Sequence, residues 1–196
     1  MTLILASSSE IRRRLLANAG IAVEVVEPRI DEVAVRAGLA PDLPVARVAE
    51  TLAEAKARTV SASRPADHVI GADQILVLGD AIYAKPGDLA EARRHLVSLR
   101  GRTHMLVTAA VVLRHERILT TITDSANLTM RHFTDQFLDR YLAAAGPDVT
   151  GSVGAYRLEE LGAQLFDRIE GDYFTILGLP LLPLLAFLRA ERLIPS

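Results

Sequence analysis

An acidic residue interrupts an apolar segment near the middle of the chain. Val69–Ala72 and Ile75–Leu78 are both apolar runs of strand-like composition, and Asp73 and Gln74 stand between them. An ionised carboxylate in such a setting costs several kcal/mol unless a cation or a hydrogen-bond donor meets it. A break of this kind in the apolar pattern indicates a functional position. The alternative from this segment alone is that Asp73 ends the first strand and caps a turn.

Two lysines could act at the same site as Asp73. Lys85 follows a short turn at Gly79-Asp80, so its charge could return to the edge where Asp73 lies. Lys56 falls on the apolar stripe of a helix expected over Val45–Ser61. At such a position a lysine either extends past its own stem to solvent or points into a pocket as a phosphate-binding cation. The helical pattern leaves both alternatives open.

The first twenty residues have the composition of an anion-binding segment. Leu3–Ala6 predicts a short buried strand, and Ser7-Ser8-Ser9-Glu10 has the Ser-x-x-Glu pattern that begins a helix. Free N–H groups and the helix dipole favour anions at such an N-terminus. The alternative is a capped surface helix whose arginines are solvated. The candidate phosphate ligands are Ser7, Ser9, Arg12 and Arg13.

Acidic residues from separate segments could hold a divalent cation. Glu32 lies next to Asp31 within Pro28–Leu43, which we expect to be a loop, and Asp73 is the second carboxylate. Mg²⁺ prefers oxygen ligands and keeps substrate phosphates in its coordination shell. Together with the basic positions above, these carboxylates match a metal-assisted reaction at a polyphosphate. No Gly-x-x-x-x-Gly-Lys motif is present, which excludes an ordinary P-loop NTPase.

Alternating strands and helices must position these groups. Further strands are expected over Val23–Val26, Met105–Leu113, Ile118–Leu128 and Gln164–Ile169. Further helices are expected from Ser7-Ser8-Ser9-Glu10 to about Ala19, from Asp88 to near Gly101, and over Thr134–Ala145 and Leu181–Leu193. The segment Arg114–Arg117 has the pattern of a hairpin connection. This mixture predicts an α/β protein with a mixed sheet.

Composition narrows the classes of function. The chain has 196 residues, a net charge of −2 and 5% aromatic residues, which argues against a dedicated nucleic-acid-binding module because such a module needs a basic face. It has no cysteine, so disulfides and thiol nucleophiles are excluded. The longest apolar stretch, Thr175–Leu188, is too short to span a bilayer, and the first residues do not form a secretory signal. We therefore expect a cytoplasmic protein without a membrane or nucleic-acid partner.

Several motifs in this order resemble the Maf family of nucleoside triphosphate pyrophosphatases. LILASSSEIRRRLL is similar to the family's opening Leu-Ala-Ser-x-Ser-Pro-x-Arg pattern, and VIGADQILVLGDAIYAKPGD to its Gly-Ala-Asp-[Thr/Gln] strand followed by Lys-Pro. LRGRTH, GAYRLEELGAQLFDRIEGDY and GLPL resemble its later signatures in order and spacing. Collinear motifs are far more specific than one short pattern. They cover almost the whole chain, which implies one Maf-like domain over residues 1–196.

The resemblance implies a fold, a reaction and a set of site residues. The fold is α/β, with an elongated mixed sheet, flanking helices and two lobes around a deep cleft. The reaction is hydrolysis of a nucleoside triphosphate to the monophosphate and pyrophosphate, with Mg²⁺ or Mn²⁺ as cofactor. Such a chain could also form a homodimer. By position, Asp73 matches the family's proton acceptor, Glu32, Lys56 and Lys85 match other pocket positions, and Arg12 matches the second residue of an arginine pair.

Three further positions fall where the family distinguishes bases. These are Ile11, Gln74 and Glu159, whereas the branch that hydrolyses dTTP and UTP typically has arginine, threonine and glutamine there. The combination here is more similar to the branch that acts on 7-methyl-GTP, although Ile11 is not the aromatic residue found in part of that branch. We therefore expect 7-methyl-GTP or a related purine triphosphate as substrate. The alternatives are a dTTP/UTP pyrophosphatase and a non-catalytic regulator of septum formation.

Overall fold

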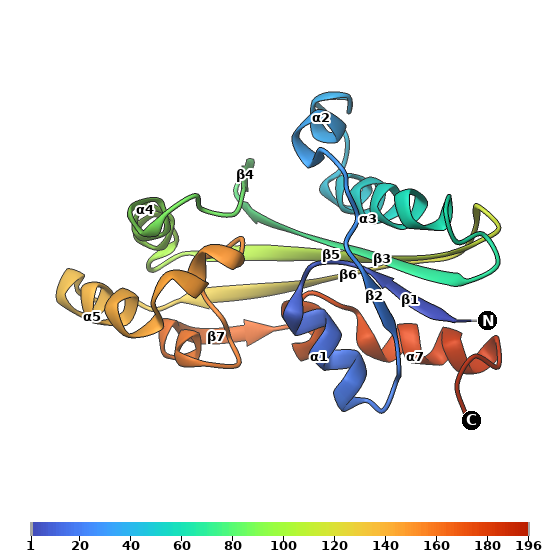
Figure 1. Ribbon diagram of the computed structural model, residues 1–196. Coiled ribbons are helices and arrows are strands. Elements are labelled where there is room, and N and C mark those ends of the chain that lie inside the picture. Colours follow the sequence, from blue (N-terminus) through green and yellow to red (C-terminus); the bar gives the residue numbers. More distant parts are fainter. Residues whose placement is uncertain (1, 196) are drawn as a thin grey trace. The chain divides into compact units, whose positions relative to one another are not determined.

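Within residues 2–195, seven strands form one mixed sheet (Figure 1). Its strand order is β2-β1-β3-β5-β6-β7, and β4 pairs with β3 outside this path. β1 is parallel to β2 and to β3, whereas β4 is antiparallel to β3 and β7 is antiparallel to β6. The strands are β1 Leu3–Ala6, β2 Glu24–Val26, β3 His68–Leu78, β4 Ala81–Tyr83, β5 Thr103–Arg114, β6 Arg117–Met130 and β7 Phe166–Glu170.

Helices flank this sheet, as the sequence predicted for an α/β fold. The computed structural model describes residues 2–195. Its α-helices are α1 Glu10–Asn18, α2 Glu32–Ala37, α3 Val45–Ser61, α4 Leu89–Leu99, α5 Asp135–Ala145, α6 Tyr173–Ile176 and α7 Leu181–Ala190. Two short 3₁₀ helices, η1 Pro147–Gly151 and η2 Leu161–Leu165, lie between α5 and β7. Among the described residues, no helix combines the length and the apolar composition needed to cross a membrane.

The chain divides into two compact units. Unit 1 contains the residues up to Gln74, Val107–Asp124 and the residues from Gly178 onward, and unit 2 contains Ile75–Leu106 and Ser125–Leu177. In unit 1, α3 covers one face of the sheet, and α1 and α7 cover the other (Figure 1). Fully buried aliphatic side chains fill both layers of this unit, among them Ile4, Leu5, Leu16, Leu52 and Ile70.

A glycine on β3 lets α3 approach the sheet closely. A Cβ added to Gly71 would lie 2.1 Å from the carbonyl oxygen of Ala53 and 2.8 Å from the nitrogen of Ala57, and both atoms belong to the α3 backbone. Because side chains alternate along a strand, Gly71 and Asp73 point to the same face of β3. The missing side chain at Gly71 therefore sets how near α3 comes to Asp73.

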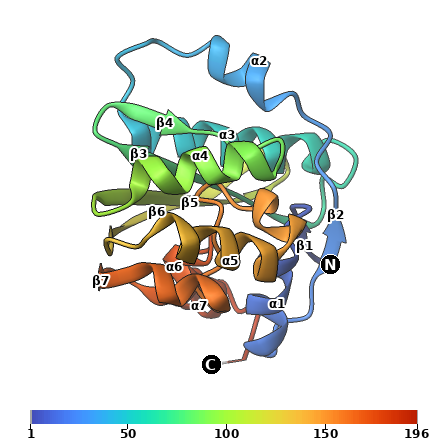
Figure 2. The same ribbon diagram turned by 90° about the vertical axis from the view of Figure 1, so that its left-hand side faces the viewer.

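Unit 2 has its own apolar core. The buried residues Leu76, Leu96, Leu128 and Leu138 belong to one cluster, and α4 and α5 lie alongside each other over it (Figure 2). Tyr156 belongs to this cluster, and His104 is buried beside it, with 2.8 Å between the His104 Nε2 atom and the Tyr156 hydroxyl. The rings of Tyr156 and Phe166 meet edge to face, with 4.8 Å between their centroids.

Most expected elements are present, and their ends follow the local signals. The helix over Val45–Ser61 is confirmed at both ends. Asp88 and Thr134 cap α4 and α5 by accepting hydrogen bonds from the nitrogens of residues 91 and 137. The hairpin is also confirmed, because the strands β5 and β6 are neighbours joined by a two-residue turn in which both residues have positive φ. The last helix ends at Ala190, three residues earlier than expected.

One local expectation was wrong, and one of the two alternatives for Asp73 is excluded. β3 runs without a break through Asp73, so Asp73 does not end a strand or cap a turn. The segment Pro28–Leu43 contains a helix, α2, because the Asp31 carboxylate accepts a hydrogen bond from the Ala34 nitrogen and caps it. At α1 the helix begins at the Ser-x-x-Glu pattern, as expected, and Ser9, the residue before its first turn, makes no side-chain cap. A single Maf-like domain, with a deep cleft between two lobes, stays a prediction.

We expect Gly71→Ala to destabilise the protein strongly, because the added methyl group would overlap backbone atoms of α3 that cannot move alone. Overpacking of this kind costs ~3 kcal/mol of unfolding free energy, measurable by urea unfolding. Gly151→Ala is the matched control, since a Cβ there meets nothing within 4 Å. Equal unfolding free energies for the two variants would contradict the close approach of α3.

Burial lowers the pKa of His104 to about 4, from an ordinary value of 6.5. The unfolded chain therefore binds more protons than the native state between these two values. This difference contributes about 3 kcal/mol to the free energy of unfolding. The contribution is fully present above pH 6.5 and is lost as the pH falls toward 4. His104→Gln should flatten the decline of unfolding free energy between pH 7 and 4, whereas His132→Gln, at an exposed position, should not. Parallel pH profiles for His104→Gln and the wild type would refute this role.

Candidate active site

A buried lysine joins two carboxylates in unit 1. The Nζ atom of Lys56 donates a hydrogen bond to Oδ1 of Asp73 over 2.5 Å and lies 2.8 Å from Oε1 of Glu32. Asp73 is 4% exposed and Lys56 is 7% exposed. Charges removed from water this far are stable only when they are paired. Of the two alternatives for Lys56, its burial excludes the solvated one.

Three different elements bring this lysine and its two carboxylates together. Lys56 follows Leu52 by one turn on the buried stripe of α3, so its stem lies against the sheet. Asp73 points toward the same helix from β3, on the face that Gly71 leaves open. Glu32 lies in the first turn of α2, and α2 packs against α3. The carboxylates are 41 positions apart in the chain, so only the tertiary fold makes them neighbours.

Arg12 is buried beside the same cluster but binds protein atoms. Its Nε donates to the carbonyl of Gly178 over 2.7 Å, and its Nη1 donates to the carbonyl of Ala72 over 2.8 Å and to Oγ of Ser7 over 3.3 Å. The pairing of β1 with β3 ends at Gly71, so the carbonyl of the next residue, Ala72, bonds to the Arg12 guanidinium instead of to β1. Burial lowers the pKa of Arg12, and the charges of Asp73 and Glu32 oppose this shift. Arg12 thus lies within electrostatic reach of both carboxylates.

The other candidate phosphate ligands have separate surroundings. Ser7 is buried, and its Oγ accepts a hydrogen bond from the Ser9 nitrogen over 3.1 Å. Arg13 is exposed and donates to Glu10 through both Nε and Nη2. Phosphate binding by Ser7, Ser9 and Arg13 stays a prediction, and the pairing with Glu10 makes Arg13 the least favourable of them.

Gln74 lies on the opposite face of β3 from Asp73. Its Nε2 donates to Oγ1 of Thr108 on β5 over 2.9 Å. Ile11, the second base-selecting candidate in unit 1, is half-buried in the first turn of α1. Thr108 was missed by sequence reasoning, although a single hydroxyl within the apolar run of β5 was a signal that could have found it.

Lys85 and Glu159 belong to unit 2. Lys85 is exposed in the segment that follows β4, and Glu159 is half-buried just before η2. That these two residues act together with the Asp73 cluster stays a prediction.

The carboxylates of unit 1 have the right chemistry for a magnesium ion. Oδ2 of Asp73 is buried and has no hydrogen-bond partner, so this oxygen can accept a further cation or a water molecule. Within residues 2–195, no group of three His, Cys, Asp or Glu gathers to form a complete metal cage. A divalent cation held by Asp73 and Glu32 would therefore take its other ligands from water and substrate phosphates, which is how Mg²⁺ usually binds.

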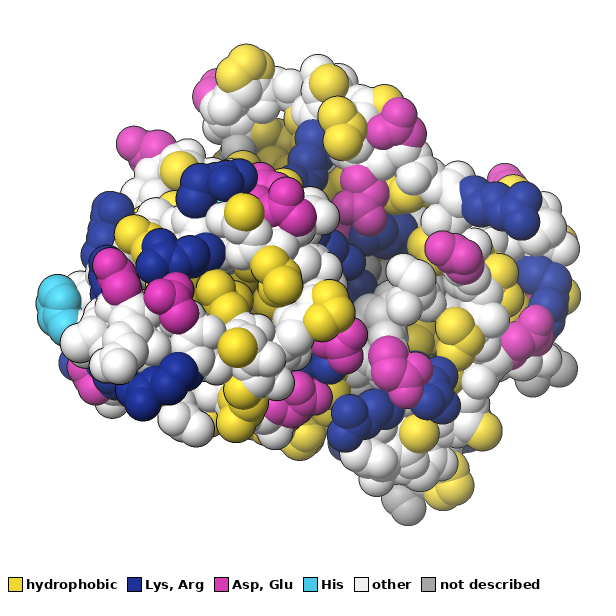
Figure 3. Space-filling model, turned by 60° about the vertical axis from the view of Figure 1, so that its left-hand side comes forward, with side chains coloured by type: hydrophobic (Ala, Val, Ile, Leu, Met, Phe, Trp, Pro, Cys, Tyr) yellow, Lys and Arg dark blue, Asp and Glu magenta, His cyan; other side chains and the backbone are white. Residues whose placement is uncertain are grey.

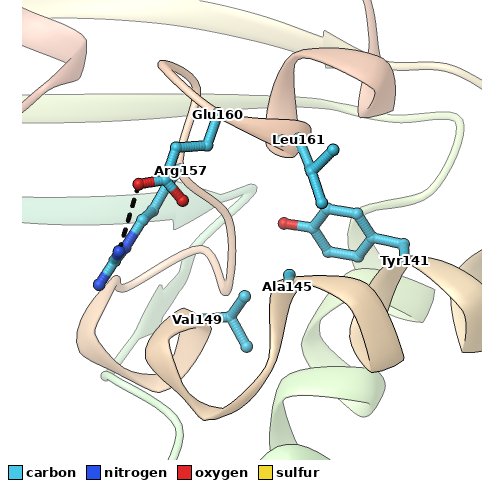
Figure 4. A pocket seen from close by; sticks show the side chains of 7 residues that line it. Tyr141, Ala145, Val149, Arg157, Glu160 and Leu161 are labelled. Atoms are coloured by element: carbon cyan, nitrogen blue, oxygen red, sulfur yellow. Dashed lines mark hydrogen bonds and ion pairs between the residues drawn. The ribbon is translucent and has the colours of Figure 1, made fainter.

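Unit 2 contains a small depression lined by Tyr141, Val149, Arg157, Glu160 and Leu161 (Figure 4). Its volume is about 10 Å³, which is room for one water molecule at most. Arg157 Nη1 and Glu160 Oε1 pair across its rim at 3.3 Å, and burial raises the pKa of the Tyr141 phenol. A cavity of this size cannot hold a nucleotide base.

Acidic, basic and apolar side chains are interspersed on the face drawn in Figure 3. This face carries no broad basic stripe of the kind that follows a nucleic-acid backbone. The mixture agrees with the nearly balanced charge of the chain.

Comparison with known proteins identifies the family. A model of the family described as "Maf-like protein" matches residues 2–191. A protein of Caulobacter vibrioides named "Nucleoside triphosphate pyrophosphatase" is 53% identical over 186 residues, covering 94% of this chain and 93% of that protein. Proteins named "7-methyl-GTP pyrophosphatase" from Mesorhizobium japonicum and Rhizobium meliloti are 50% and 51% identical, each over 95% of this chain and 94% of the relative. The chain therefore belongs to the Maf family.

Proposed function

We propose that this protein is a nucleoside triphosphate pyrophosphatase, which converts its substrate to the monophosphate and pyrophosphate. The observation that carries the proposal is the buried contact of Lys56 with Asp73 and Glu32, beside Arg12. Such a cluster has the charges that a metal–triphosphate needs, and similar proteins named for this activity share about half of their residues with the chain.

The reaction needs charge neutralisation more than covalent chemistry. A triphosphate carries about four negative charges, which repel a nucleophile that approaches the α-phosphorus. Asp73 and Glu32 would hold the divalent cation, which when bound neutralises phosphate charge and polarises the phosphoryl oxygens. Lys56 and Arg12 are the cations of unit 1 that would stabilise the charge moving onto the pyrophosphate leaving group.

Asp73 is the residue of this cluster that we assign to the attacking water. Its Oδ1 is taken by Lys56, whereas its Oδ2 has no partner and can accept a hydrogen bond from that water. A carboxylate that shares its charge with a cation is a weak proton acceptor, so orientation of the water is its main contribution. A buried charged cluster would have no such use in a non-catalytic regulator of septum formation, and no feature of the described residues favours that alternative.

We expect Asp73→Asn to reduce kcat by about 10²–10⁴-fold, the range for a lost acid–base group, because the amide keeps the volume but loses the charge. The assay separates pyrophosphate from orthophosphate and is run with Mg²⁺, Mn²⁺ or chelator. Asp42→Asn, at an exposed position in unit 1, is the control and should keep full activity. Activity of Asp73→Asn within threefold of the wild type would remove Asp73 from the reaction. Release of orthophosphate with a nucleoside diphosphate would instead show that attack is not at the α-phosphorus.

For the base, we propose 7-methyl-GTP or a related purine triphosphate. Glu159 as a carboxylate can only accept hydrogen bonds, which suits the N1–H and N2–H₂ donors of guanine, and N7-methylation adds a positive charge that a carboxylate also favours. Uracil and thymine present two acceptors beside one N–H, a pattern that an amide meets better. Relatives named for 7-methyl-GTP support this choice over dTTP or UTP. A cytoplasmic location, the absence of a nucleic-acid partner and a homodimer belong to the same proposal.

We expect the wild type to hydrolyse 7-methyl-GTP with a higher kcat/KM than dTTP or UTP, and Glu159→Gln to narrow this gap by about 10-fold or more. Glu160→Gln is the control, because Glu160 is adjacent, exposed and paired with Arg157. A preference of the wild type for dTTP or UTP would show that the base assignment is wrong and would leave the pyrophosphatase proposal intact.

A further inference from the structure

We propose that in the absence of nucleotide the ammonium of Lys56 occupies the position at which the divalent cation binds. In the nucleotide-free protein its ammonium holds Glu32 and Asp73 together, and it releases them to a divalent cation only when a triphosphate arrives to take the ammonium. This inference rests on the proposed function and adds to it an order of binding, in which the metal enters with the nucleotide and not before it.

The first argument is geometric. One nitrogen lies 2.5 Å from an oxygen of Asp73 and 2.8 Å from an oxygen of Glu32. A magnesium ion bound by the same two oxygens would stand ~2.1 Å from each. At these two oxygens it would need the space that the Lys56 ammonium fills, so the lysine and a metal bound there exclude each other.

The second argument comes from burial. Lys56 and Asp73 are almost completely buried, so a displaced ammonium cannot simply move into water while its stem stays on the α3 stripe. It needs another anion within reach, and a phosphate group is one. Glu32 differs from these two because its side chain is 44% exposed and stands on the six-residue helix α2. Glu32 is accordingly the carboxylate that can move first, and it marks the side from which the metal enters.

The third argument is the balance of charge. The two positive charges of Lys56 and Arg12 equal the two negative charges of Glu32 and Asp73, so these four residues carry no net charge. A free divalent cation would leave two uncompensated positive charges in a buried place, which is unfavourable. A metal bound to a triphosphate brings excess negative charge instead, and the released lysine can pair with it. The buried, unpartnered Oδ2 of Asp73 shows in addition that the cluster has acceptor capacity beyond what Lys56 uses.

The test measures metal binding without nucleotide. Mn²⁺ is titrated into the wild type and into Lys56→Met, and free Mn²⁺ is followed by electron paramagnetic resonance. We expect weak binding to the wild type and a Kd at least 10-fold lower for Lys56→Met, because the Lys56 ammonium then no longer occupies the two carboxylates. Lys56→Arg, which keeps the charge, should bind like the wild type. Adding Asp73→Asn to Lys56→Met should abolish the gain.

For variants whose stability is low, Mn²⁺ binding is followed by thermal unfolding, with Tm measured in the presence and absence of Mn²⁺. Lys56→Met and Lys56→Gln should gain several degrees in Tm from Mn²⁺, and the wild type should gain little. A variant that folds only with Mn²⁺ supports the proposal, and one that Mn²⁺ cannot fold overturns it. Equal Mn²⁺ affinity of Lys56→Met and the wild type also overturns it. These measurements involve no turnover, so they fail or succeed independently of the product assay that tests the pyrophosphatase function.

Discussion

The structure of the candidate site depends on one interaction, the contact of the Lys56 ammonium with the carboxylates of Asp73 and Glu32. An ionised aspartate in the middle of a buried strand would be strongly destabilising without a nearby positive charge. An ionised lysine on the buried stripe of a helix would be equally unfavourable without an anion. Each charge makes the other tolerable, and breaking the pair would leave an uncompensated buried charge.

Local features of the backbone make that contact geometrically possible. The absence of a side chain at Gly71 admits the α3 backbone to van der Waals distance of β3. The two-residue alternation of the strand then aims Asp73 at the helix. From α1 on the other face of the sheet, Arg12 donates a hydrogen bond to the carbonyl of Ala72, the residue directly before Asp73. This hydrogen bond holds β3 in place beyond the point where its pairing with β1 ends. Packing and hydrogen bonding thus position one carboxylate from two sides.

The same contacts suit a ligand of mixed charge, such as the proposed metal–triphosphate. Two cations and two anions in a mostly buried place are balanced, and one carboxylate oxygen remains without a partner. A metal–triphosphate would supply charges of both signs to this cluster. A free metal ion or a free anion supplies only one sign and would upset the balance. The electrostatics of unit 1 therefore agree with the activity after which its relatives are named.

Sequence alone determined the features that depend on near neighbours in the chain. The helix over Val45–Ser61, the caps at Asp88 and Thr134 and the hairpin turn all follow from periodicity and turn chemistry, which act over a few residues. The unusual placement of Asp73 and Lys56 in apolar patterns was also visible, because a pattern shows where a charge does not belong. The family followed from several collinear motifs that span the chain.

Only the tertiary structure decided which partner each unusual residue has. Whether Lys56 reached solvent or a carboxylate depends on the distance between α3 and β3, and this distance is set by a glycine fifteen positions away in the chain. Two acceptors of Arg12, the carbonyls of Gly178 and Ala72, lie 166 and 60 positions away in the chain, so no local pattern could indicate them. The helix at Glu32 was missed because its sequence signal was a single capping aspartate before a helix of only six residues. Local propensity acts within a few residues, whereas the pairing of buried charges is decided by which segments the fold packs together.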